Sequence, residues 1–259
     1  MSNYIGITRR IRGGGIAVSA KEIIFHQRSR LPAVVNVLVF LLAGAVRLYN
    51  IKAPGLLIDR EYASAIIARD FYFDHMASAE EWRKEMAHIT RQNQPILEPP
   101  VTEFLVSLMY QAVGSEQLWL ARLLTSSFWL VGGIFLYKIA ETVTATDAAI
   151  FATAYYLFLP MSILLSRSFQ PDSLMMMLFL ISLFSILRYY EKSSDFRLVT
   201  AASVSGLALL YRPLVLFTLL GAFTALAIHQ KGAWKRIPDR RFLIFMALSL
   251  VPTVLYYGY

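Results

Sequence analysis

The chain has 259 residues, of which 57% are apolar and only 16% charged, and its mean hydropathy is +0.52. This composition excludes an ordinary soluble domain and indicates a membrane protein. The absence of cysteine excludes disulfides and thiolate metal sites. The formal net charge of +8 does not point to nucleic acid, because basic residues gather in the cytoplasmic loops of membrane proteins.

Long apolar segments predict that most of the chain crosses a membrane as helices, since about 20 apolar residues span the hydrocarbon core. The stretch from Leu198 to His229 is too long for one crossing, and Arg212-Pro213 interrupts it, so we predict two short spans there. Ala43-Gly44-Ala45 resembles a signal-peptide cleavage site, but the long preceding segment favours a retained helix. The other predicted spans are Leu31–Tyr49, Leu118–Lys138, Asp147–Ser166, Ser173–Tyr190 and Phe242–Tyr259.

The segment Val101–Gly114 is apolar but too short for a crossing, and it carries Glu103 after Pro99-Pro100. These features favour a juxtamembrane helix. If the segment does not cross, the main basic clusters all lie on one side of the membrane, as the positive-inside rule requires. We therefore predict an all-α polytopic membrane protein with about seven transmembrane helices and a cytoplasmic N-terminus.

This topology divides the chain into four parts. Residues 1–30 form a basic cytoplasmic segment, residues 31–49 the first span, residues 50–117 an extracytoplasmic loop with juxtamembrane helices, and residues 118–259 six further spans. The loop holds ten of the 17 acidic residues. Because the chain stops at its last predicted span, we expect it to be truncated.

The loop opens on an acidic cluster that contains Asp59 and Glu61, just before a predicted surface helix at Arg60–His75. Asp is a preferred N-cap, and an acid in the first turn is favoured by the helix dipole. A carboxylate at this place also suits general-base chemistry. Spacing alone leaves capping and catalysis equally open for Asp59.

Two further polar features fall on the same predicted face of the membrane. The turn from Ser166 to Asp172 carries Arg167, and Arg212 lies at the outward end of a broken span. Arginine suits phosphate through forked hydrogen bonds. The structural alternatives are that Asp172 caps the following helix and that both arginines extend their charged ends toward the membrane surface.

At these residues the chain resembles the membrane-embedded GT-C glycosyltransferases, in the branch that contains the dolichyl-phosphate-mannose-protein mannosyltransferases and the aminoarabinose lipid A transferases. The resemblance covers roughly Leu31 to Tyr259. It differs in that Arg60 separates Asp59 from Glu61, where many members have adjacent Asp and Glu, and in that Glu98 stands where many have Lys. The motifs that carry it are Asp59-Arg60-Glu61-Tyr62 with Ile67–Tyr72, Glu98-Pro99-Pro100 with Glu103-Phe104, Arg167 to Asp172, and Gly206 to Pro213.

The resemblance implies inverting transfer of a sugar from a polyprenyl-phosphate donor to a lipid, glycan or protein acceptor at the extracytoplasmic face of a membrane. Asp59 would be the general base, aided by Glu61. Donor phosphate would contact Arg167, Arg212 and Arg60, while Asp172, Glu98 and Glu103 would orient the site. We expect contact with membrane lipids, no nucleic-acid partner, and a bacterial or archaeal plasma membrane in preference to the endoplasmic reticulum.

No ligand set in the sequence predicts a metal site, so no cofactor is assigned, and a divalent cation stays open. Two alternative functions also stay open. A transporter or flippase of a lipid-linked substrate would likewise place charges at mid-depth, but transporters tend to show repeated halves, and we find none. A non-catalytic membrane subunit or fragment would fit the early end of the chain.

Overall fold

The computed structural model describes residues 31–53, 59–76, 78–94, 98–231 and 240–258. The predicted cytoplasmic segment at residues 1–30 lies outside these ranges. The described residues form helices joined by short turns, without a strand, and the predicted all-α class is confirmed. The helices are α2 (Leu31–Leu48), α3 (Asp59–Asp74), α4 (Glu81–Gln92), α5 (Val101–Val113), α6 (Leu118–Val143), α7 (Thr146–Phe158), α8 (Pro160–Arg167), α9 (Asp172–Glu191), α10 (Asp195–Tyr211), α11 (Val215–Lys231) and α12 (Arg240–Tyr257).

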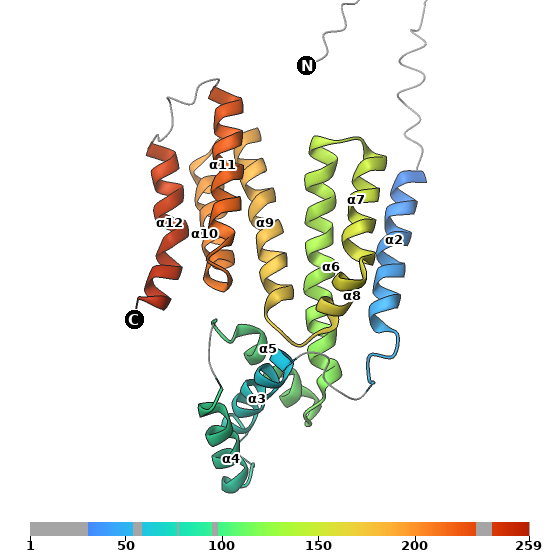
Figure 1. Cartoon of the computed structure of the whole chain (residues 1–259), viewed down its shortest axis with the longest axis vertical. Coiled ribbons are helices and arrows are strands. Elements are labelled where there is room, and N and C mark those ends of the chain that lie inside the picture. The colour runs from blue at the N-terminus through green and yellow to red at the C-terminus, as the bar shows by residue number, and fades with distance from the viewer. Residues whose placement is uncertain (1–30, 54–58, 77, 95–97, 232–239, 259) are drawn as a thin grey trace, which may run out of the picture.

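The long helices run alongside one another in a bundle, and α3, α4 and α5 lie together beyond one of its ends (Figure 1). Helix α9 packs between α6 and α10, and α10 also packs on α12. Helix α3 packs on both α4 and α5. The C-terminal end of α2, the N-terminal end of α6, the turn before α9 and the turn after α10 all lie at the same end of the bundle (Figure 1).

Four of the described helices are long and apolar enough to cross a membrane: α2, α6, α9 and α12. Helices α7 and α8 pass the same test as a pair, which gives up to five spans. Helices α10 and α11 have 17 residues each, about 26 Å of helix, and fall short of the length criterion. The membrane-protein class is therefore established, while the predicted count of seven spans is not confirmed.

The predicted span Asp147–Ser166 is not one straight helix. It breaks after Phe158, and the axes of α7 and α8 differ by 58°. The cause is Pro160, which has no N–H to donate and which favours an extended conformation for the residue before it. Leu159 indeed has φ −54° and ψ 133°. The buried Arg47 of α2 donates to the carbonyl of Leu157 next to this break.

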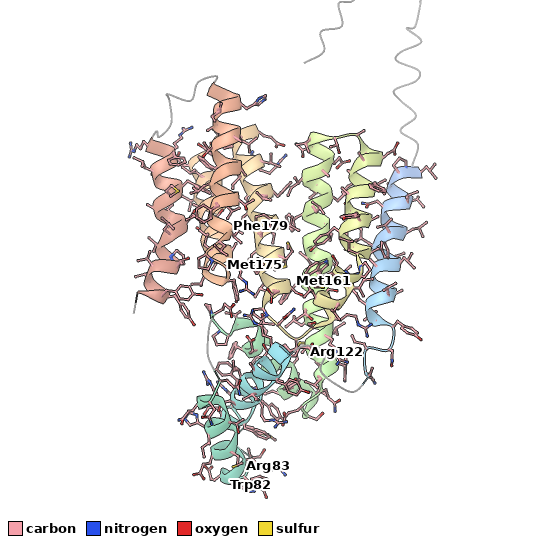
Figure 2. The ribbon with its side chains drawn as sticks, viewed as in Figure 1. Trp82, Arg83, Arg122, Met161, Met175 and Phe179 are labelled. Carbon is pink, nitrogen blue, oxygen red and sulfur yellow. The ribbon has the colours of Figure 1, made fainter. Side chains whose placement is uncertain are left out.

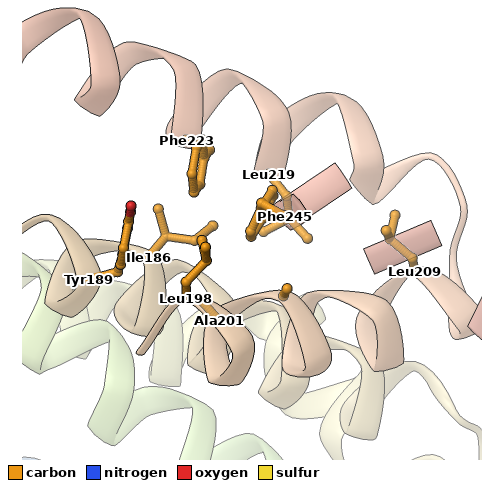
Figure 3. Close-up of a cluster of buried hydrophobic side chains, with 9 residues drawn as sticks. Ile186, Tyr189, Leu198, Ala201, Leu209, Leu219, Phe223 and Phe245 are labelled. Carbon is orange, nitrogen blue, oxygen red and sulfur yellow. The ribbon is translucent and has the colours of Figure 1, made fainter. Parts of the chain in front are cut away.

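The second proline break occurs where the sequence predicts it. Helix α10 ends at Tyr211, and α11 begins at Val215. The buried side chains of α9, α10, α11 and α12 form one core around Phe223 and Phe245, whose stacked rings have centroids 4.2 Å apart (Figure 3). Gly206 lets α12 approach α10 closely, because a Cβ at this position would lie 3.0 Å from the carbonyl oxygen of Ser249.

A separate core joins the α3–α5 unit to the bundle. Tyr72 of α3, Tyr110 of α5 and Leu120 of α6 pack around Phe169, which lies in the turn before α9 and is 1% exposed. Arg122 of α6 adds polar contacts at the same junction, where it donates to the carbonyls of Ile51 and Ala53 (Figure 2). These contacts fix the unit against one end of the bundle.

Candidate active site at the end of the helix bundle

Four charged side chains meet between the α3–α5 unit and the bundle and form a closed ring of ion pairs. Arg60 of α3 contacts Glu98, which precedes α5. Glu98 lies 3.6 Å from Arg212, and Arg212 lies 2.8 Å from Asp172. Asp172 closes the ring at 3.8 Å from Arg60. Two positive and two negative charges thus alternate around the ring and balance one another.

The ends of two bundle helices hold the bundle's side of this ring. Asp172 is the first residue of α9, after Pro171. Arg212 follows the last residue of α10 in an extended conformation, with its N–H bonded to the carbonyl of Ala208, and Pro213 prevents the helix from continuing. The hydrogen bond from Arg212 to Asp172 is the main cause of the raised pKa of Arg212, so its guanidinium stays charged.

Asp172 accepts a hydrogen bond from Arg212 and, as the first helical residue, does not occupy the N-cap position of α9. The N-cap residue is Pro171, and no side chain caps this helix. The capping alternative for Asp172 is therefore wrong. Its carboxylate instead connects the start of α9 with the end of α10.

Glu61 is fully buried, and its Oε1 accepts the backbone N–H of Phe169 at 2.7 Å. This bond ties α3 to the turn before α9. The sequence predicts Glu61 as a helper of the catalytic base, but its carboxylate has no exposed surface through which to meet an acceptor. The geometry gives it an anchoring contact next to the ring.

Glu103 is also buried, and its Oε1 accepts a hydrogen bond from Ser64 of α3 at 2.6 Å. Its second oxygen has no hydrogen-bond partner among the described residues. Burial is the main cause of the raised pKa of Glu103, and repulsion by Glu98 adds to it. The Ser64 hydroxyl and Arg60 act in the opposite direction.

Arg167 stands apart from the ring. Its Nη2 donates to the carbonyls of Tyr49 and Asn50, at 2.9 and 3.3 Å, where the chain leaves α2. A helix end leaves its last carbonyls without helical partners, and Arg167 supplies donors to carbonyls just beyond that end. The Nε of Arg167 is buried and has no hydrogen-bond partner among the described residues.

Asp59 is the first residue of α3 and directly precedes Arg60. Its side chain lies outside the described part of the structure, so neither capping nor catalysis is tested for it. The backbone nevertheless places the predicted base one residue from a member of the ring.

Sequence reasoning identified all four members of the ring but missed three supporting side chains. Ser64 reads as an ordinary polar residue of a surface helix, and Tyr211 as a residue of a membrane span. Both are buried, and the Tyr211 hydroxyl has no hydrogen-bond partner among the described residues. Arg122 could have been suspected, because an arginine near the start of a membrane-length helix needs partners.

No group of three or more His, Asp or Glu side chains that could hold a metal ion occurs within the described ranges. What the arrangement offers is two guanidinium groups beside carboxylates, at the junction of a polar unit and an apolar bundle. Such a site can bind an anionic group at the surface of a membrane.

The fold and the site together define an integral, multi-pass membrane protein with a charged site at one end of its helix bundle. A family profile described as dolichyl-phosphate-mannose-protein mannosyltransferase matches residues 97–257. The chain belongs to this family of membrane glycosyltransferases, and the resemblance to the GT-C superfamily is confirmed. Searches of curated proteins and of solved structures gave no significant match.

The matched residues include most of the ring, namely Glu98, Asp172 and Arg212. They also include Glu103 and Arg167. Helix α3, with the predicted base, precedes the match. Membership of the family supports a mannosyltransferase-like glycosyltransferase in general.

Proposed function

We propose that the protein transfers a sugar from a polyprenyl-phosphate donor to a hydroxyl or amine acceptor at the extracytoplasmic face of the membrane. The observation that carries this proposal is the ring of Arg60, Glu98, Asp172 and Arg212. It places two arginines where apolar helices meet a polar unit. A lipid-linked phosphate needs the same combination, because its tail lies among the apolar helices and its head requires cations.

In the proposed reaction, Asp59 takes the proton of the acceptor as the acceptor atom attacks the anomeric carbon of the sugar. The bond from that carbon to the phosphate oxygen breaks, and the electron pair leaves with the polyprenyl phosphate. Attack from the side opposite the phosphate inverts the anomeric configuration. Arg60 and Arg212 stabilise the negative charge that develops on the leaving phosphate.

The remaining predicted residues have supporting roles in this proposal. Asp172 holds Arg212, and Glu61 holds the turn that precedes Asp172. Glu103 is a buried carboxyl group hydrogen-bonded to Ser64 of α3. Arg167 is a further candidate for contact with phosphate. No step requires a metal ion, and a divalent cation at the phosphate is kept as an addition for experiment to decide.

The proposed side of the membrane follows from charge. The C-terminal ends of α6, α9 and α11 and the N-terminal ends of α10 and α12 lie at the end of the bundle away from α3–α5 (Figure 1). These ends carry basic residues such as Lys138, Arg188 and Arg240. We propose, by the positive-inside rule, that these ends face the cytoplasm and that the ring faces outward. We propose a bacterial or archaeal plasma membrane.

The test uses membranes that contain the protein and a polyprenyl-phosphate sugar radiolabelled in the sugar. Label appearing in lipid, glycan or protein acceptors establishes transfer. Label that crosses the membrane while still attached to its carrier would establish the flippase alternative. Label that stays on its carrier without crossing would contradict both activities. Mannose and aminoarabinose donors, tested side by side, distinguish hexosyl from pentosyl transfer.

A further inference from the structure

Glu98 lies between the two arginines of the ring and contacts both of them. It touches Arg60 with both carboxylate oxygens and lies 3.6 Å from Arg212. Its side chain is 10% exposed, the lowest value among the four members of the ring. A carboxylate held by two guanidinium groups occupies the place where those groups would hold an oxyanion of a ligand.

Glu98 is also the member of the ring whose backbone is least fixed by hydrogen bonds. Arg60 lies in the first turn of α3, and Asp172 begins α9. Arg212 has its N–H and its carbonyl bonded to Ala208 and Val215. Glu98 instead lies in a bend before Pro99-Pro100, and its backbone makes no hydrogen bond to another described residue. Glu98 can therefore leave the ring without breaking a helix.

The charges of the ring favour one exchange in particular. The four members sum to zero, and loss of the Glu98 carboxylate leaves one positive charge without a partner. A phosphodiester, such as the phosphate of an intact polyprenyl-phosphate sugar, carries one negative charge and restores the balance. The product of sugar transfer is a phosphomonoester with a charge of about −1.5 to −2 at neutral pH, so the arginines hold it at least as strongly as the donor, and a competing carboxylate favours its release.

We propose that Glu98 is an internal competitor for the donor phosphate, which vacates the site between Arg60 and Arg212 when donor binds and returns to displace the polyprenyl-phosphate product. This inference rests on the proposed function, because it takes the donor to be a lipid-linked phosphodiester. It gives Glu98 a regulatory role in place of a purely orienting one. The competing carboxylate lowers the affinity for the donor, and it also shortens the time for which the product stays bound.

The experiment measures binding of polyprenyl phosphate to the protein in phosphatidylcholine nanodiscs, with wild type compared with Glu98→Gln and Glu98→Asp. The Asp variant keeps the charge. Glu116→Gln is the matched control, because Glu116 forms an ion pair with Arg69 at 2.7 Å in the same extramembrane unit, outside the ring. Discs with phosphatidylglycerol in place of polyprenyl phosphate, and inorganic phosphate in the buffer, separate the lipid carrier from other sources of phosphate.

We expect Glu98→Gln to bind polyprenyl phosphate about fivefold more tightly, because the variant lacks the carboxylate that competes for both arginines through partly exposed ion pairs. Glu98→Asp and Glu116→Gln should stay near wild type, and the gain should vanish when Arg212→Gln is added. In transfer assays, Glu98→Gln should show a lower KM for donor together with stronger inhibition by polyprenyl phosphate. A thermal melt of each variant checks that the fold is kept.

Weaker or unchanged binding by a folded Glu98→Gln protein would overturn the inference, because it would show that Glu98 only positions the arginines. That outcome would leave the proposed function standing if the wild type still bound polyprenyl phosphate. Equal tightening toward phosphatidylglycerol or inorganic phosphate would overturn the assignment to the donor carrier. Failure of both wild type and Glu98→Gln to bind polyprenyl phosphate would contradict the inference and the proposed donor together.

Discussion

The backbone N–H of Phe169 donates to Oε1 of Glu61 at 2.7 Å, and both residues are almost completely buried. This bond joins α3, the first helix of the α3–α5 unit, to the turn that leads into α9. Three residues after Phe169, Asp172 enters the ring of ion pairs, and one residue before Glu61, Arg60 enters it from the other side. The bond therefore helps to hold α3 and the turn before α9 at the spacing across which the ring closes.

The first prediction separates anchoring from catalysis at Glu61. Glu61→Ala should lower the free energy of unfolding by about 1.5–3 kcal/mol, because it removes a hydrogen bond to a charged acceptor and leaves the Phe169 N–H buried without that partner. Glu61→Gln keeps an acceptor oxygen, so it should lose less stability and keep most of the transfer activity. Thermal unfolding and sugar transfer are measured on the same preparations. A loss of 100-fold or more in Glu61→Gln, with stability retained, would show that Glu61 acts in the chemistry.

The second prediction concerns the proposed base. Asp59→Asn should reduce the rate of sugar transfer by about 10²–10⁴-fold, the usual effect of losing a general base, without reducing the amount of protein in the membrane. Asp74→Asn is the matched control, since Asp74 ends the same helix and its side chain is 77% exposed. Near-normal transfer by Asp59→Asn would contradict the assignment of Asp59 as the general base.

The helices were largely predictable because their signals are local. Apolar runs of membrane length identify the long spans, and the short length of Val101–Gly114 identified a helix that packs on α3 outside the bundle. The sequence predicts one of the two proline breaks. Pro213 interrupts an apolar stretch that is too long for one span. Pro160 lies in an apolar run of the right length for one span, so the sequence does not predict the bend beside it.

The members of the site were predictable one by one, but their partners were not. Motifs and topology point to each member of the ring, namely Arg60, Glu98, Asp172 and Arg212. Their pairing into a ring depends on how α3, α9 and α10 pack, which no local pattern encodes. The same holds for Glu61, which reads as an exposed acid in the first turn of a helix and is buried only because the turn at Phe169 folds over it.

The third prediction concerns the guanidinium group of Arg212 and its paired N–H donors. Arg212→Lys keeps the charge but loses the planar pair of N–H groups that can hold Asp172 and a phosphate oxygen together. The KM for the polyprenyl-phosphate donor should rise roughly tenfold or more, as loss of one charge-assisted hydrogen bond implies, with a smaller change in thermal stability. Arg188→Lys is the control, because Arg188 pairs with Glu191 near the C-terminal end of α9, away from the ring. An unchanged donor KM would remove Arg212 from the phosphate site.

The last prediction follows from the raised pKa of Glu103. Burial makes the folded protein hold the proton of this carboxyl group more tightly than the unfolded chain, whose pKa is near 4.5. Below that pH both states are protonated, and the group costs the fold nothing. As the pH rises from about 4.5 through the raised pKa of the folded state, ionisation of the buried carboxyl group costs free energy, and the folded state loses stability.

Glu103→Gln imitates the protonated form, accepts a hydrogen bond from the Ser64 hydroxyl as before, and should lack this loss of stability. Thermal melts in nanodiscs at a series of pH values should therefore diverge, with wild type falling below Glu103→Gln as the pH increases. Glu116→Gln, tested in parallel, should follow wild type. Parallel curves for wild type and Glu103→Gln across the series would show that Glu103 titrates as an ordinary exposed acid.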